Sequence, residues 1–161
     1  MKQNFLSPVD FKMTVKRLPN TEFFVQRANI PSLLMNPTQR QTPLAMLYQP
    51  GDTLSYGELT VTLRLDENMD SYMEIYNWMT HMAGPDRYTA YKNMIEGEGL
   101  YTDIELTIMN SSKNPAVGFT FHDCFPISIG DVQLDITSPD ILFATADVSF
   151  RYTQFIAEKV T

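Results

Sequence analysis

Two groups of residues in this sequence are of types that could do chemistry. Asp66 and Glu67 are adjacent carboxylates of the kind used in general acid and base catalysis. His122, Asp123 and Cys124 are consecutive residues of metal-ligating type. They lie in an alternating run typical of a strand, where neighbouring side chains point to opposite faces, so the three cannot ligate one ion. Carboxylates just before a helix stabilise its N-terminus, and this is the role we expect for Asp66 and Glu67.

Other motifs of catalysis or cofactor binding are absent from the sequence. It has no Gly-x-Ser-x-Gly nucleophile elbow, no glycine-rich phosphate loop and no paired-cysteine motif. His81 is expected in the last turn of a helix, where a cationic group suits the dipole. Trp78 and the 10 methionines favour adaptable packing over a cofactor site. We therefore expect a protein that is not an enzyme and has no cofactor or bound metal.

Composition and charge restrict the possible partners. Twelve Lys and Arg against 19 Asp and Glu give a net charge of −7, which disfavours nucleic-acid binding but permits DNA as a passing cargo. The single cysteine, Cys124, excludes an internal disulfide and fits assembly in a reducing cytoplasm. No segment has the ~20 consecutive apolar residues of a membrane span. The polar start of the sequence predicts no secretory signal.

The segment from residue 51 to residue 85 carries the clearest structural signals. Apolar residues alternate with polar ones in a predicted strand, at Leu59, Val61, Leu63 and Leu65. A helix over about residues 69–83 is predicted from an apolar stripe at i, i+3, i+4 and i+7, formed by Tyr72, Ile75, Tyr76 and Met79. Gly84 and Pro85 are expected to end this helix.

Alternation predicts further strands on both sides of this segment. Residues 9–17 and 22–30 are expected to form an opening hairpin, the first with Val9, Phe11, Met13 and Val15 on its covered face. After a polar connection at 86–99, strands are predicted at 100–109, 116–125, 131–137 and 141–155, with Pro126 breaking the second. The short connections indicate antiparallel pairing. We predict one domain over residues 1–161, a mainly β antiparallel sandwich or barrel with one flanking α-helix and a long extended arm loop.

The arm, at about residues 31–57, combines prolines with apolar side chains. Pro31, Pro37, Pro43 and Pro50 exclude a long helix and disfavour a central strand. The segment nevertheless contains Leu33, Leu34, Met35, Leu44, Met46, Leu47 and Tyr48. Two alternatives remain open on composition: a loop folded back over the core, or an extended arm that docks on a neighbouring subunit through Leu44, Met46, Leu47 and Tyr48.

The order of several motifs resembles a known family. These motifs are Gly51-Asp52, Thr60-Val61-Thr62, Asp66-Glu67 and a helix bearing Tyr76 and Trp78. FFVQRANIPS at 23–32, FHDCFPISIGDVQLD at 121–135 and VSFRYTQF at 148–155 agree with them. Together they are similar to the tail tube proteins of contractile-tailed, T-even-like bacteriophages, and the likeness extends over nearly the whole sequence.

This resemblance implies a structural virion protein. Its hexameric rings would stack into a tail tube, the conduit for genome ejection inside a contractile sheath. The implied partners are further copies of itself, the sheath protein, and tape-measure and baseplate proteins, with assembly in the host cytoplasm. An acidic lumen would not retain passing DNA. Our candidates for lumen-facing residues are Glu58, Asp103 and Glu105, which alternatively only solvate the outside.

Other interpretations of the sequence either keep the fold of a tail tube protein or assign the chain to a different class. A tube-end paralogue, either a baseplate tube initiator or a tail terminator, and a type VI secretion tube protein would have the same architecture. The length favours a simple tube protein, because an initiator would be expected to carry additional domains. A different class is a monomeric β-barrel that binds a small apolar ligand through its methionines and phenylalanines.

Overall fold

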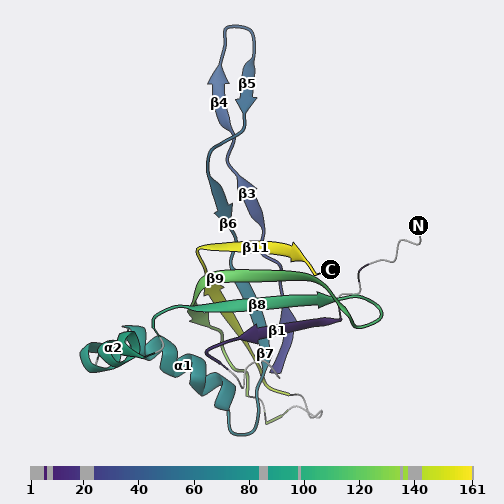
Figure 1. Cartoon of the computed structure of the whole chain (residues 1–161). Coiled ribbons are helices and arrows are strands. Elements are labelled where there is room, and N and C mark those ends of the chain that lie inside the picture. Colours follow the sequence, from purple (N-terminus) through teal and green to yellow (C-terminus); the bar gives the residue numbers. More distant parts are fainter. Residues whose placement is uncertain are drawn as a thin grey trace.

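Seven strands form an antiparallel sheet that folds into two layers along its longest strand, β9 (Pro115–Ile129) (Figure 1). The first layer contains β1 (Phe11–Val15), β8 (Thr102–Met109), the N-terminal part of β9, and β11 (Gln154–Lys159). The second layer contains the C-terminal part of β9, β10 (Thr145–Arg151), β7 (Leu59–Arg64) and β2 (Val25–Ala28). Figure 1 shows the strands of the first layer running across those of the second.

This computed structural model describes residues 6, 9–18, 24–83, 87–97, 99–134, 136–137 and 143–160. The predicted class, mainly β and antiparallel with a flanking helix and an extended arm, is confirmed. None of the helices in the described part of the chain is long and apolar enough to span a membrane.

The core lies between the two layers and follows from strand alternation. In β7 the apolar residues Leu59, Val61 and Leu63 are buried while the residues between them are partly exposed, as predicted. In the predicted strand 9–17, Met13 and Val15 are buried, but Val9 precedes β1 and is exposed. The buried apolar core also includes Leu18, Ile75, Trp78, Ile104, Leu106, Phe121, Cys124, Val148 and Phe150.

The predicted opening hairpin is wrong. β1 pairs with β8 in the first layer, and β2 pairs with β7 in the second. Both strands have an apolar face, but these faces cover the core from opposite sides, so the chain changes layer between them. Periodicity shows that a strand has one covered face and does not show which strand lies beside it. Most of the predicted turn, at 19–21, lies outside the described residues.

β9 is longer and less regular than predicted. Asp123 has a left-handed φ of 56°, and the register with β8 shifts there, so Phe121 and Cys124 are both fully buried although three residues apart. The strand continues past Pro126, where a second register shift against β10 accommodates the missing N–H. The predicted strand 131–137 is wrong for its described residues, which have no strand pairing. The predicted strand 141–155 divides into β10 and β11, which belong to different layers.

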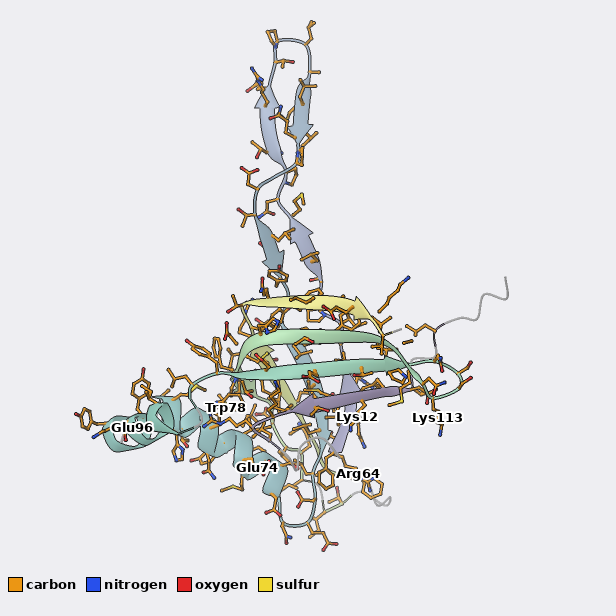
Figure 2. The ribbon with its side chains drawn as sticks, viewed as in Figure 1. Lys12, Arg64, Glu74, Trp78, Glu96 and Lys113 are labelled. Atoms are coloured by element: carbon orange, nitrogen blue, oxygen red, sulfur yellow. The ribbon has the colours of Figure 1, made fainter. Side chains whose placement is uncertain are left out.

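Helix α1 (Asp70–Ala83) has nearly the predicted bounds, and its buried face agrees only in part with the predicted stripe. Ile75 of that stripe is buried and Met79 packs against the core, but Tyr76 is exposed. Ser71 and Trp78, outside the stripe, are buried as well. Trp78, labelled in Figure 2, donates from Nε1 to the Leu100 carbonyl at 3.3 Å and so fixes α1 against the sheet. Gly84 and Pro85 lie outside the described residues.

A second helix, α2 (Arg87–Glu96), occupies the predicted polar connection. It lies beside α1 at the edge of the molecule (Figure 1). Its sequence has little amphipathic periodicity, and local helix formers with an ion pair between Lys92 and Glu96 at 3.8 Å support it. Weak periodicity concealed this helix from sequence reasoning.

Candidate assembly surface

The most prominent functional feature is an arm that projects from the sheet (Figure 1). Near its root, β3 (Leu33–Met35) pairs with β6 (Leu54–Tyr56). Farther out, β4 (Thr38–Gln41) pairs with β5 (Met46–Gln49). The arm is therefore a long two-stranded hairpin, and the alternative of a loop folded back over the core is wrong.

Local sequence explains this hairpin. At the tip, the Ala45 N–H donates to Thr42 Oγ1 at 3.2 Å, and the Thr42 N–H donates to the Ala45 carbonyl at 3.0 Å. Pro43 lies inside this turn, where its fixed φ is favourable. Between the two paired sections the strands approach closely at Gly51, where an added Cβ would lie 1.8 Å from the Asn36 carbonyl oxygen. Only glycine fits there without moving the backbone.

The root of the arm is fixed by aromatic contacts. The Tyr56 ring lies 6.0 Å from that of Tyr152 and 5.6 Å from that of Phe155, both edge-on. The Tyr152 hydroxyl donates to the Gly57 carbonyl at 2.8 Å. Burial raises the pKa of Tyr152 from 10.0 to about 12, so this donor keeps its proton further into the alkaline range. The arm therefore has a rigid base.

Beyond that base, the arm exposes apolar side chains. Leu44, Met46, Leu47 and Tyr48, the predicted interface residues, are 98%, 51%, 50% and 65% exposed. In the β4–β5 register, Arg40 lies opposite Leu47 and Gln39 lies opposite Tyr48, so the hairpin has apolar side chains on both faces. Figure 2 shows the arm and its side chains extending away from the sheet layers. An isolated hairpin is marginally stable in water, and an exposed apolar surface of this kind is typical of an interaction site.

The sheet also presents strand edges. β1 and β11 each pair on one side with a described strand of the first layer, and β2 does so in the second layer. Strand edges with free backbone groups are templates for pairing with another chain. Arm and edges together form a surface suited to self-assembly.

The three acidic residues predicted to face the lumen lie at two places in the structure, two on β8 and one at the root of the arm. Asp103 and Glu105 lie together on β8, where Lys16 Nζ is 3.9 Å from Asp103 and 4.0 Å from Glu105. His122 Nδ1 is 3.6 Å from Asp103. Glu58 lies at the root of the arm and pairs with Arg151 at 3.0 Å. All three carboxylates are thus partly exposed and have cationic partners, so their charge is partly compensated.

The residues considered for chemistry lie on separate elements: Asp66 and Glu67 before α1, His81 in α1, and His122, Asp123 and Cys124 on β9. In the part of the chain that the structure describes, no three His, Cys, Asp or Glu residues are grouped to hold a metal ion. Cys124 is buried, and this raises its pKa to about 12, so its thiol is unreactive at neutral pH. Asp66 and Glu67 lie at the corner before α1, as predicted, where the Asp66 carbonyl accepts from the Met69 N–H at 3.1 Å. His81 lies in the last turn of α1, as expected.

Comparison with known proteins gives relatives of matching length. The tail tube terminator protein of Enterobacteria phage T4 is 26% identical over 160 residues, covering 94% of this chain and 89% of the relative. The tube-terminating cap of the anti-feeding prophage has a TM-score of 0.74 at 13% identity, covering 99% and 95% of the two chains. A chain of the sheath–tube complex of an extracellular contractile injection system, PVC, has a TM-score of 0.69 at 13% identity, covering 96% and 92%. At these identities the solved structures show the fold alone.

A match to a family model identifies the family of this chain, because the match extends over nearly all of the elements described above. A family model described as phage tail tube protein matches residues 6–158, which include both sheet layers, the arm and both helices. This chain therefore belongs to the phage tail tube protein family.

Proposed function

We propose that this chain is a ring-forming subunit of a contractile phage tail, and that its hexameric ring closes the end of the tail tube. The observation that carries the proposal is the arm, which is anchored at Tyr56 and exposes apolar residues from there to its tip. Burial of these side chains requires a neighbouring subunit, because the arm points away from its own core.

The strand edges support ring formation. Pairing of the β1 edge of one subunit with the β11 edge of the next would extend the first layer around a ring and leave neither edge exposed. In such a ring the face of β8 that holds Asp103 and Glu105 would be turned to the lumen, where carboxylates repel passing DNA. The role is structural, without catalysis. The sheath protein would lie outside, and tape-measure or baseplate proteins would meet the tube elsewhere in the tail.

Likeness to the T4 tail tube terminator over nearly the whole chain favours the closing ring. The second candidate is the repeating subunit of the tube itself, which the likeness to a chain of a sheath–tube complex supports. The two candidates differ in one physical property. A repeating subunit offers complementary top and bottom surfaces and polymerises, whereas a closing ring stops after one layer.

Sedimentation velocity and negative-stain microscopy of the purified protein test this proposal. A closing ring is expected to form discrete hexameric rings that do not lengthen as the concentration rises. Rods that grow with concentration would contradict the closing ring and identify the chain as the repeating subunit of the tube. A protein that stays monomeric at high concentration would contradict both. The control is deletion of residues 36–48, which should leave a folded subunit that does not assemble.

A further inference from the structure

A hollow of ≈800 Å³ lies at the end of β7 opposite to the arm. β7 begins just after the root of the arm and ends at Arg64, directly before the hollow. The lining comes from the corner before α1, from the start of α1, from the segment after β9 and from the residues just before β10. It includes Asp66, Glu67, Tyr72, Asp131, Leu134 and Phe143. Arm and hollow are therefore at opposite ends of one subunit (Figure 1).

The lining combines apolar surface with carboxylates. Leu134 is 86% exposed and Phe143 is 61% exposed. Asp66, Glu67 and Asp131 contribute acidic groups, and Asp66 Oδ1 is buried with no hydrogen-bond partner among the residues that the structure describes. A buried acceptor without a donor is costly. The nearby Arg64, labelled in Figure 2, does not supply one, because its guanidinium lies over the Phe143 ring at 3.2 Å from the centroid.

The arm carries the complementary groups. Arg40 and Leu47 are directly opposite in the β4–β5 register and so lie on one face, and Leu44 lies at the tip beyond them. Among the described residues, no carboxylate is within ion-pair distance of Arg40. A guanidinium is well matched to carboxylates at an interface, and leucine side chains fit an apolar wall.

We propose that the Arg40–Leu47 face of the arm docks into the hollow of a second copy of this chain. Arg40 would donate to Asp66 and Asp131 of that copy, and Leu47 would contact its Leu134. This inference rests on the proposed self-assembly and names the surface that accepts the arm. The contact joins two different surfaces, so it is a heterologous interface, which can close the proposed ring of subunits and does not give an isolated two-fold dimer.

Disulfide cross-linking tests the contact directly. Leu47→Cys and Leu134→Cys are combined in one chain, in which the native Cys124 is buried and unreactive. Mild oxidation of the assembled protein should give a ladder of linked copies on a non-reducing gel. Leu47→Cys combined with Ser112→Cys, an exposed residue of the β8–β9 turn, is the matched control and should give no ladder.

A charge exchange tests the ion pair. Arg40→Glu alone and Asp131→Arg alone should each weaken association tenfold or more by sedimentation, roughly the effect of losing one charged hydrogen bond. The double variant, with both changes, should recover at least half of the association free energy that a single change loses. A wild-type assembly with neither cross-link nor rescue would overturn the docking and leave the proposed function standing. A wild-type protein that never assembles would overturn both.

Discussion

Replacing the apolar side chains of the arm should separate assembly from folding. The variant combines Leu44→Ser, Met46→Ser, Leu47→Ser and Tyr48→Ser. None of these side chains belongs to the buried core or to the apolar residues packed against it. Exposed positions of this kind usually change stability by less than about 0.5 kcal/mol each. The subunit is therefore expected to unfold at nearly the wild-type temperature.

The effect on association follows from the exposed fractions of 98%, 51%, 50% and 65%. Burial of a whole apolar side chain contributes roughly 1.5–3 kcal/mol, so burial of the exposed parts would contribute roughly 4–8 kcal/mol per arm. Even half of the lower figure, about 2 kcal/mol, weakens association roughly thirtyfold. The lower figure itself corresponds to roughly a thousandfold.

Sedimentation velocity over a concentration series measures the association, and circular dichroism during heating measures the fold. The matched control replaces exposed apolar residues outside the arm, Tyr88→Ser with Ile95→Ser on α2, and should assemble as the wild type does. Assembly of the arm variant at wild-type concentrations would refute the reasoning. A collapse of its unfolding temperature would instead show that the arm contributes to its own core.

Three further predictions concern the sheet and its core. Trp78→Phe should lower the free energy of unfolding by about 1 kcal/mol, since it loses the Nε1 hydrogen bond to Leu100, and Trp78→Ala by roughly 3–5 kcal/mol, in urea titrations; a Trp78→Phe variant as stable as the wild type would show that the hydrogen bond contributes nothing. The raised pKa of Cys124 means that the folded state keeps a proton that the unfolded chain releases above about 9.0, so stability should fall as the pH rises from 9 toward 12. Cys124→Ala should remove that part of the pH dependence, and an unchanged slope would contradict it. Asp103→Lys with Glu105→Lys should still assemble, because both side chains are partly exposed, yet reduce infectivity if they face the lumen; normal infectivity would exclude them from the lumen wall.

Local patterns predicted the elements that depend on neighbouring residues. The alternation of Leu59, Val61 and Leu63 predicted β7, and the apolar spacing with acidic residues at the start predicted α1 to within a residue at its N-terminus. Prolines at four places in the arm predicted an extended segment, because proline removes backbone donors and restricts φ. The pairing inside the arm was not predicted, since it depends on the turn at Thr42–Ala45 and on the close approach at Gly51.

Which face of α1 is buried could not be read from its sequence. Apolar residues surround much of the helix, and Ile75 belongs both to the predicted stripe with Tyr72 and Tyr76 and to the buried face with Trp78. The sheet decided between them, because the Trp78 ring reaches the Leu100 carbonyl and lies 6.5 Å from the Phe150 ring. Long-range contacts of this kind leave no periodic signal in either partner.

The sequence alone determined that this chain is a mainly β protein with an apolar arm, an acidic balance and no recognisable catalytic motif, because these properties depend on composition and on spacings of a few residues. Tertiary structure decided which strands are neighbours, where the arm points and which surfaces lie opposite it. The separation of β1 from β2 and the gathering of Asp66, Asp131 and Phe143 around one hollow join residues far apart in the chain. Such proximity arises only when the two layers close on their common core, so only the folded chain could indicate a place for the arm to dock.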